Sequence, residues 1–472
     1  MKRVWLVPLL LTAVLTQNCM VGPNYKRPAV TAPPQFRGAS GVQTDTPPAQ
    51  TSLADTKWFD LFQDDKLTDL VRVALAQNYD LRIASARVLE ARAQLGITRS
   101  QIFPTIGGAA SLNSNIPSSV AATTFIPAGT DLSASYFQAG FTLGWELDVW
   151  GRIRRLTEAA RAQYFATEEA RRGVITTLIS DVSTNYFNLR EADLELDIAN
   201  QTLVDARNGL RLTTLRLNGG TATAIDVRQA EQFLYTATSE IAAAQRQIEQ
   251  SENLLSLLTA RNPQAVVRGK ALTDFVTPPE IPAGMPSALL ERRPDIRESE
   301  QNLIAANADI GAAKAQYFPQ INLTGLLGAQ SRALTSLFTG PARDWSFAPA
   351  ITVPIFNAGR IRNGVRLTEA QKQEALAGYE KSIQTAFREV SDSLVGYRRT
   401  AEQRTQQELL VKALRDSVRL SNLRYTGGLD SYLPVLDADR NLFQGELDLA
   451  RLKRDELTSV VSLYRALGGG WQ

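Results

Sequence analysis

The 472-residue sequence contains no histidine and only one cysteine, Cys19. The absence of histidine removes the most common general base and the most common metal ligand of proteins. A disulfide within the chain is excluded because it needs a second thiol. The sequence also has no phosphate-binding loop, no zinc-binding pattern and no nucleophile elbow. We therefore expect a protein that is not an enzyme, without catalytic residues, a metal site or a cofactor.

The sequence also lacks a large excess of charge of either sign, and it lacks long hydrophobic runs. The 51 basic and 48 acidic residues give a formal charge of +3 and form no like-charge block, so no nucleic-acid partner is expected. After the first 18 residues there is no apolar run of about 20 residues, the length that a transmembrane helix needs. Insertion into a membrane would therefore have to use β-strands.

The first 18 residues have the order of a secretory signal, because Lys2 and Arg3 precede an apolar run over residues 4–15. Cys19 follows at the place where a bacterial lipoprotein is cleaved and acylated. Residues 16–18 differ from the usual cleavage pattern, which has an aliphatic residue first and a small one last. We expect residues 1–18 to be a signal peptide and Cys19 to carry a lipid. The alternative is an ordinary cleavage site beside an isolated thiol.

The rest of the chain contains an internal duplication. Gly-Arg-Ile occurs at 151–153 and 359–361, and Arg-Leu-Asn-Gly-Gly at 216–220 matches Arg-Tyr-Thr-Gly-Gly at 424–428 with the same offset. Each copy is expected to run short helix, strand, loop, strand, long helix, turn, helix. The predicted domains follow the signal peptide and are these: a lipidated, proline-rich segment at 19–62, a first repeat at 63–262, a connector at 263–286 and a second repeat at 287–472.

Heptad spacing predicts an antiparallel helical hairpin in each copy. Large apolar residues recur every seven positions, often with a small residue three places later, which is typical of left-handed coiled coils. The heptad positions are Ile175, Val182, Leu189, Leu196, Leu203, Leu210 and Leu217, then Val227, Leu234, Ile241, Ile248 and Leu255, and in the second copy Val435, Leu442, Leu449 and, past an interruption at Glu456, Leu463. A helix over 151–217 would be about 100 Å long and would project from a membrane. A plain coiled-coil stalk would explain these heptads equally well.

Alternating segments predict strands with one lipid-facing side. Apolar residues alternate with small or polar residues over 137–147, 321–328 and 345–355, and the segment after Pro104 is compatible with the same pattern. A half-exposed sheet in a soluble domain is the alternative. Two strands per copy make about four per chain, fewer than the roughly eight that a membrane barrel needs. Several chains would have to share one barrel, and the strand count alone allows two or three.

The segment Cys-Met-Val-Gly-Pro-Asn-Tyr-Lys-Arg-Pro at 19–28 resembles the mature start of outer-membrane efflux lipoproteins, the TolC-like channels of RND-type tripartite pumps. Leu-Leu-Glu-Arg-Arg-Pro-Asp-Ile at 289–296 resembles that family's most recognisable stretch. The resemblance covers the mature chain. It implies an α+β membrane protein, a homotrimer whose twelve-stranded β-barrel continues into a periplasmic α-helical barrel.

The resemblance also implies function, location and partners. The chain would be the lipid-anchored exit duct of a tripartite efflux system in the outer membrane of a Gram-negative bacterium, conducting small molecules passively. Its partners would be outer-membrane lipid, a periplasmic adaptor and an inner-membrane RND-type pump. The alternatives are the exit duct of a type I protein secretion system and an envelope coiled-coil tether that forms no channel.

By resemblance, a periplasmic gate lies at the start of the last helix. Asp437 and Arg440 are three residues apart, on one helix face and off the seam of Val435 and Ala438. Repeated by symmetry, they would form stacked acidic and basic rings at the aperture. The alternative is an ordinary surface ion pair. Two further residues match positions that narrow or tether the same constriction, and these are Tyr425 and Leu433.

The hairpin tips are the expected adaptor contacts. The Gly-Gly pairs at 219–220 and 427–428 permit tight reversals, and Thr223 with Asp226 has the spacing of a capping box. By resemblance, the residues at or near the adaptor contact are Arg216, Gly220, Arg424, Gly428 and Ser431. The arginines among them could equally be solvated helix ends.

Overall fold

The structure is a computed structural model that describes residues 20–30, 32–37, 52–55, 58–115, 134–276 and 285–470. Cys19, the signal peptide and part of the connector lie outside these ranges. The described chain forms two compact units, and each takes segments from both predicted repeats. Unit 1 contains Met1–Pro28, Leu89–Ala166 and Ser299–Gly378, and unit 2 contains Ala29–Val88, Thr167–Glu298 and Tyr379–Gln472.

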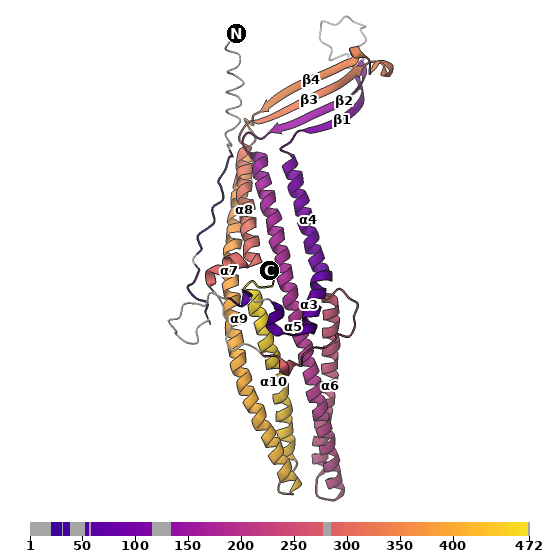
Figure 1. The fold of residues 1–472 in the computed structure, drawn as a ribbon, viewed down its shortest axis with the longest axis vertical. Coiled ribbons are helices and arrows are strands. Elements are labelled where there is room, and N and C mark those ends of the chain that lie inside the picture. Colours follow the sequence, from indigo (N-terminus) through magenta and orange to yellow (C-terminus); the bar gives the residue numbers. More distant parts are fainter. Residues whose placement is uncertain are drawn as a thin grey trace. The chain divides into compact units, whose positions relative to one another are not determined.

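The order of two helices, two strands and two helices occurs twice along the chain (Figure 1). The described α-helices and strands are α2 (Trp58–Phe62), α3 (Asp65–Gln77), α4 (Tyr79–Ser100), β1 (Thr105–Asn115), β2 (Ala134–Leu147), α5 (Arg152–Asn218), α6 (Ala224–Leu258), α7 (Pro286–Arg292), α8 (Pro294–Ala315), β3 (Gln320–Ser331), β4 (Arg343–Thr352), α9 (Arg360–Thr426) and α10 (Leu433–Ala466). Short 3-10 turns are η1 (Leu53–Asp55), η2 (Leu272–Asp274), η3 (Leu334–Ser336) and η4 (Gly340–Ala342).

Two helices lie directly before each strand pair, α3 and α4 in the first copy and α7 and α8 in the second, where the sequence predicted one short helix. Asn78 separates α3 from α4 because its backbone, with ψ 134°, leaves the helical region and its side chain accepts a hydrogen bond from the Leu81 amide at 3.0 Å, which starts a new helix. In the second copy Arg293 is extended and Pro294 opens α8, a first-turn position where its missing N–H costs nothing. None of the described helices is both long and apolar enough to cross a membrane.

The strands form one antiparallel sheet in unit 1, in the order β1-β2-β3-β4. The register pairs Gly140 with both Ala109 and Gly328, and Phe141 with Gly108 and Leu327. The strand prediction over 137–147 is confirmed by β2. The last strand is shorter than predicted, because β4 ends at Thr352, just before Val353 and Pro354. Within β4, Pro349 is tolerated because β4 is an edge strand of this sheet.

This register separates the side chains onto two faces of opposite character. The mostly apolar face carries Ile106, Gly108, Ala110, Leu112, Phe137, Ala139, Phe141, Leu143, Trp145, Leu147, Ile321, Leu323, Gly325, Leu327, Ala329, Trp345, Phe347, Pro349 and Ile351, and at the loop end of the strands it also carries Ser114, Ser135, Ser331 and Arg343. The opposite face carries Ser111, Asn113, Gln138, Thr142, Glu146, Gln320, Asn322, Thr324, Gln330, Asp344, Ser346 and Thr352, with glycines and alanines between them and with Tyr136 and Leu326 as its large side chains of other character. The alternation predicted from sequence is therefore present in all four described strands.

The first described residues are fixed against the start of α5 in unit 1. The buried Arg155 donates to the carbonyls of Val21 at 3.1 Å and Gly22 at 3.2 Å, and to the Asn24 side chain at 2.8 Å. Gly22 has φ +97°, and a Cβ there would lie 2.4 Å from the Gly311 Cα. Only glycine fits this close approach. The chain directly after Cys19 is therefore held in one place within this unit.

Asp64 and Glu456 are two of the buried carboxylates in the core of unit 2, and both have defined partners. Asp64 accepts hydrogen bonds from the Tyr186 hydroxyl at 3.0 Å and the Lys270 amide at 2.9 Å, and it caps α3. Glu456, the residue that interrupts the heptads of α10, is buried and pairs with Arg404 of α9 at 2.7 Å. Both carboxylates satisfy the rule that a buried charge needs partners.

Candidate functional site

The tips of both helical hairpins are closed by glycines in the left-handed conformation. Gly220 and Gly428 each have φ +74°. After α5 the Thr221 amide donates to the Arg216 carbonyl at 2.8 Å, and after α9 the Leu429 amide donates to the Arg424 carbonyl at 2.9 Å. These are the bonds that satisfy the last carbonyls of a helix in a glycine C-cap. The tight reversals predicted at the two Gly-Gly pairs are therefore present.

The two tips restart their return helices differently. Thr223 and Asp226 form the predicted capping box, in which the Thr223 amide donates to the Asp226 carboxylate at 2.8 Å and the Asp226 amide donates to the Thr223 hydroxyl at 3.3 Å. At the start of α10 the N-cap is Tyr432, which makes no side-chain capping bond, and Pro434 occupies the first turn. The α10 start is therefore less firmly capped than the α6 start.

Arg216 joins the two tips to each other. Its guanidinium donates to the Tyr425 carbonyl at 2.9 Å and lies 3.9 Å from the centroid of the Tyr425 ring. Tyr425 and Tyr432 are buried, with ring centroids 5.4 Å apart. Cation–π and charge-assisted bonds of this kind stabilise a partly desolvated contact. The structure thus places Arg216 in a contact within the chain, between the ends of α5 and α9.

Arg424 is engaged across its own turn. It forms an ion pair with Asp430, and its Nη2 lies 3.2 Å from the Asp430 Oδ1. The hydrogen bond and charge of Arg424 lower the pKa of Asp430, and the hydrogen bond and charge of Asp430 raise the pKa of Arg424. Sequence reasoning missed Asp430 as a tip residue. The available signal was the Gly-Gly pair between the two residues, because the reversal there brings Asp430 back beside Arg424.

Asp437, Arg440 and Leu433 lie on the exposed side of the first turns of α10. The Asp437 carboxylate accepts from Asn441 at 3.3 Å, and Arg440 donates to Gln232 of α6 at 3.3 Å. Within the described residues the two charges do not pair with each other. Val435 and Ala438 are buried, as the predicted seam requires. Ser431 is exposed and Leu433 is 54% exposed, both beside the turn.

A series of charged residues joins α5 to α10. Acid–base pairs form most of it, but near the tip two acidic residues lie close to each other. Glu191 pairs with Arg454 at 3.1 Å and Glu195 with Arg451 at 3.2 Å. Closer to the tip, the same two helices bring Asp439 of α10 under the influence of Asp205 of α5. Burial, and then the Asp205 charge, raise the pKa of Asp439 to about 6. The last level of this series therefore opposes two acids where the others pair an acid with a base.

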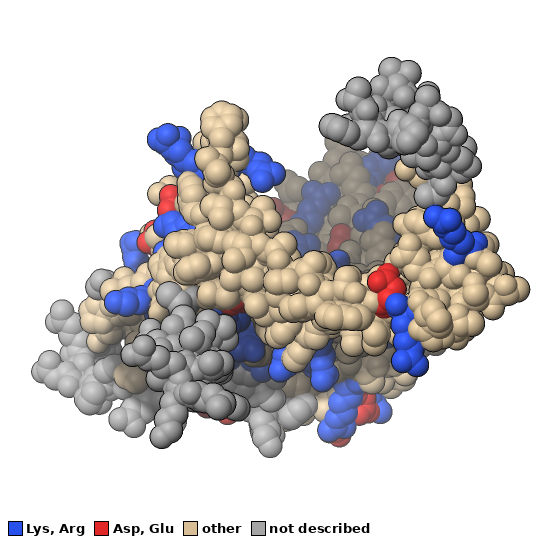
Figure 2. Space-filling model, turned by 90° about the horizontal axis from the view of Figure 1, so that it is seen from above, with Lys and Arg blue, Asp and Glu red and all other residues tan. Residues whose placement is uncertain are grey.

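The apolar face of the sheet exposes large side chains. Ile106 is 73% exposed, Phe141 65%, Leu327 67% and Trp345 74%. Broad areas without charged side chains are also visible in the foreground of Figure 2. A contiguous apolar surface of this kind marks a contact with lipid or with another protein. The edges of β1 and β4 have no partner strand within the described chain.

Known proteins resemble this chain over nearly its full length. The family model described as "Outer membrane efflux protein" matches residues 70–261 and 285–469. The chain belongs to the outer membrane efflux protein family. It is 41% identical over 458 residues to the solvent efflux pump outer membrane protein SrpC of Pseudomonas putida, covering 96% of both chains. It is 35% identical to the cation efflux system protein CusC of Escherichia coli K12, covering 98% of this chain and 99% of CusC.

A solved structure shares the fold. The open state of the MtrE outer membrane channel of Neisseria gonorrhoeae matches with a TM-score of 0.84 and 30% identity, covering 96% of this chain and 99% of MtrE. The resemblance predicted from the sequence is therefore confirmed at the level of the family. Over the residues that the structure describes, this efflux protein is mostly helical with one four-stranded sheet, and its place is the outer membrane.

The acid pair near the α10 tip makes a pH prediction for this efflux protein. Because the folded-state pKa of Asp439 is about 6 against an ordinary 3.8, the folded state binds the proton more tightly than the unfolded state. The stability that protonated Asp439 contributes to the folded state is fully present when the pH is below the ordinary pKa of 3.8. It is lost as the pH rises through the folded-state pKa of about 6. Asparagine does not titrate, so the free energy of unfolding of Asp439→Asn should rise relative to that of wild type by about 2 kcal/mol when the pH is changed from 4 to 8.

Denaturation midpoints of both proteins in detergent at the two pH values measure this gain. Asp416→Asn is the matched control, since Asp416 is exposed on α9 and its 3.5 Å pair with Arg419 is also exposed. The control should differ from wild type by the same small amount at both pH values. An Asp439→Asn difference that does not change with pH would contradict the assignment.

Proposed function

We propose that this chain is one of three identical subunits of an outer-membrane duct that passively conducts small molecules. The observation that carries the proposal is the sheet, which has one exposed apolar face, one polar face and two edges without a partner strand among the described residues. In lipid every backbone polar group needs a partner, so an open sheet of four strands cannot remain alone. Its apolar face would meet lipid and its polar face would line the pore.

The same two edges allow identical copies to close the sheet into a barrel. The β1 edge of one copy would pair with the β4 edge of the next, and three copies would supply twelve strands, within the range of membrane barrels. The family resemblance supports three copies rather than two. By that resemblance the helices of the three copies form the periplasmic tube. The four-strand sheet and the long coiled-coil helices of this chain are compatible with that assembly.

The gate is proposed at the start of α10. Asp437 and Arg440 are exposed there and are not paired with each other within the described chain, which leaves them able to pair between copies. Each exposed pair would contribute only about 0 to 1 kcal/mol, so a partner that binds the tips could open the ring. Tyr425 and Leu433 would tether and narrow the same constriction.

The partners proposed are a periplasmic adaptor and an inner-membrane pump of the RND type. The tip residues Arg216, Gly220, Arg424, Gly428 and Ser431 would lie at or near the adaptor contact. SrpC and CusC are named as outer membrane or efflux-system components, which supports this class of partner. We also propose a lipid on Cys19. The next two residues, Met20 and Val21, are held against the start of α5, which supports an anchor at this position.

Single-channel recording in planar bilayers tests both the duct and its gate. We expect wild type to insert and conduct weakly, and Asp437→Ala or Arg440→Ala to conduct more, because either change removes one charge from every subunit and with it the whole acidic or basic ring. Asp416→Ala and Arg419→Ala are matched controls, an exposed acid and base three residues apart on α9 that should leave the conductance unchanged. Equal conductance of wild type and both α10 variants would remove Asp437 and Arg440 from the gate. A water-soluble monomer that keeps its strands without detergent would exclude the duct.

A further inference from the structure

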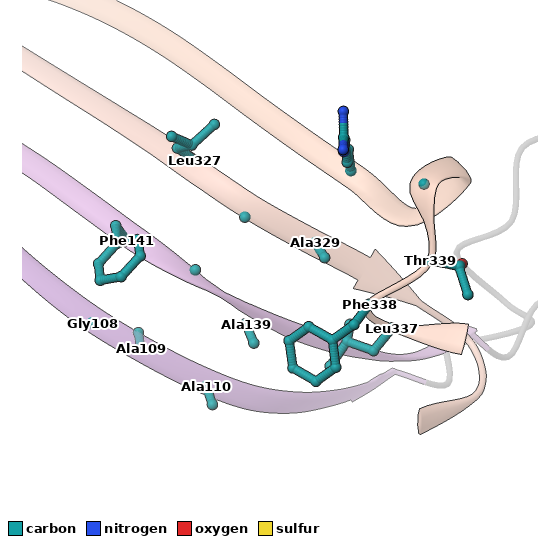
Figure 3. A pocket seen from close by; sticks show the side chains of 14 residues that line it. Gly108, Ala109, Ala110, Ala139, Phe141, Leu327, Ala329, Leu337, Phe338 and Thr339 are labelled. Atoms are coloured by element: carbon teal, nitrogen blue, oxygen red, sulfur yellow. The ribbon is translucent and has the colours of Figure 1, made fainter. Parts of the chain in front are cut away.

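The sheet of unit 1 carries a hollow of about 660 Å³ near the loop that joins β3 to β4. Its walls come from β1, β2, β3 and this loop, which contributes Leu337 and Phe338 (Figure 3). The floor is made of small residues, Gly108, Ala110 and Ala139 among them. In the register, these floor residues belong to the apolar face of the sheet, together with the flanking Phe141 and Leu327. The hollow is therefore on the side that we propose to face lipid.

A single charge lies at this hollow. Arg343 lines it, and the register pairs Arg343 with Ala329, which places the arginine on the apolar face. Among the described strand residues on that face, Arg343 is the only charged one. It is exposed and forms no ion pair within the described ranges. Arg332, also exposed, follows the end of β3 at the same end of the sheet.

The position of Arg343 suits a lipid headgroup. It is the first residue of β4, at the loop end of the strands, where the charged tip of a long side chain can reach the headgroup layer while its stem stays on apolar surface. A guanidinium there matches phosphate geometry through two parallel hydrogen bonds. Phe338, which is 84% exposed, stands beside the hollow as an apolar wall for a chain inserted from lipid.

We propose that this hollow binds one acyl chain of the phosphorylated, multiply acylated glycolipid of the outer leaflet, with a phosphate of that lipid on Arg343. The inference rests on the proposed duct, because the loop end of the strands faces the exterior only if the helices lie in the periplasm. Small floor residues leave room for the chain, the aromatic and leucine walls contact it, and the arginine selects a phosphate-bearing headgroup.

Native mass spectrometry of the detergent-purified oligomer tests this site. The probes are the bis-phosphorylated, multiply acylated glucosamine lipid, phosphatidylglycerol as an anionic lipid of different architecture, and zwitterionic phosphatidylethanolamine. We expect the glycolipid to bind most tightly, and Arg343→Gln to weaken its binding about tenfold, as expected for the loss of one charge-assisted contact. Ala139→Leu should weaken it similarly by filling the hollow. Arg343→Lys should retain part of the affinity.

Arg362→Gln is the matched control, since Arg362 is an exposed arginine on α9 and does not line the hollow. It should bind the glycolipid as wild type does. Unchanged binding by Arg343→Gln, or equal binding of phosphatidylglycerol and the glycolipid, would overturn the proposal. Measuring the conductance of the same wild-type preparation distinguishes failure of the proposed lipid site from failure of the proposed duct. A conducting oligomer without preferred glycolipid binding refutes only this site, whereas a preparation that does not insert refutes the duct.

Discussion

Asp64→Ala is expected to lower the free energy of unfolding of unit 2 by about 4 kcal/mol. The carboxylate is 3% exposed and accepts four hydrogen bonds, from the amides of Lys66 and Leu67 and from the Tyr186 hydroxyl and the Lys270 amide. Alanine would leave buried donors without partners, each costing about 1 to 3 kcal/mol. It would also remove the cap of α3, worth about 1 kcal/mol.

Chemical denaturation of the purified protein in detergent, followed by helical circular dichroism, measures this loss. Asp69→Ala is the matched control on the same helix. Asp69 is 61% exposed and pairs at 3.5 Å with Arg72, which is 66% exposed, so its removal should change the midpoint very little. If both variants shift the midpoint equally, the Asp64 contacts do not stabilise the fold as argued.

Gly140→Ala is expected to destabilise the sheet by about 2 to 3 kcal/mol per subunit, the upper part of the range for an overpacked site. A Cβ at Gly140 would lie 2.7 Å from the Gly328 Cα and 2.7 Å from the Leu327 carbonyl oxygen. These are backbone atoms, so the strands would have to separate rather than a side chain rotate. In the proposed barrel the cost would recur in every copy.

Heat-modifiable migration on gels measures the effect, as the temperature at which the assembled form is lost. Gly108→Ala is the control within the same sheet, because nothing lies within 4 Å of a Cβ built at Gly108. That variant should match or slightly exceed wild type, since alanine lowers the entropy of the unfolded chain. A Gly140→Ala protein as heat-resistant as the control would show that β2 and β3 can move apart at little cost.

The elements that sequence predicted well are those set by local periodicity. The heptads of α5 and α6, the alternation of β2 and the Gly-Gly reversals each depend on residues a few positions apart, and the structure contains the two helices, the strand and both reversals that these patterns predict. The capping box at Thr223 is another local pattern that was read correctly. Such signals need no knowledge of which segments become neighbours.

Contacts between distant segments could not be predicted in the same way. Arg216 contacts Tyr425, a residue more than 200 positions away, and Asp205 influences Asp439 across two helices of different repeats. Heptads predict that a helix has a partner but do not say which helix it is or in which register it packs. The buried Arg155 shows the same limit, because an arginine in a helical pattern predicts an exposed side chain.

The two outer strands of the sheet, which have no partner strand in the part of the chain that the structure describes, also bear on how a defective gene copy behaves beside an intact one. A subunit with a defective β4 edge and an intact β1 edge can still pair with one neighbour through β1. It cannot pair with the next neighbour through β4. One such member would leave the whole cylinder unsealed. If the ring is the proposed assembly of three copies, a cell that makes equal amounts of both chains would build only about one ring in eight entirely from intact subunits, so the defective allele would be dominant.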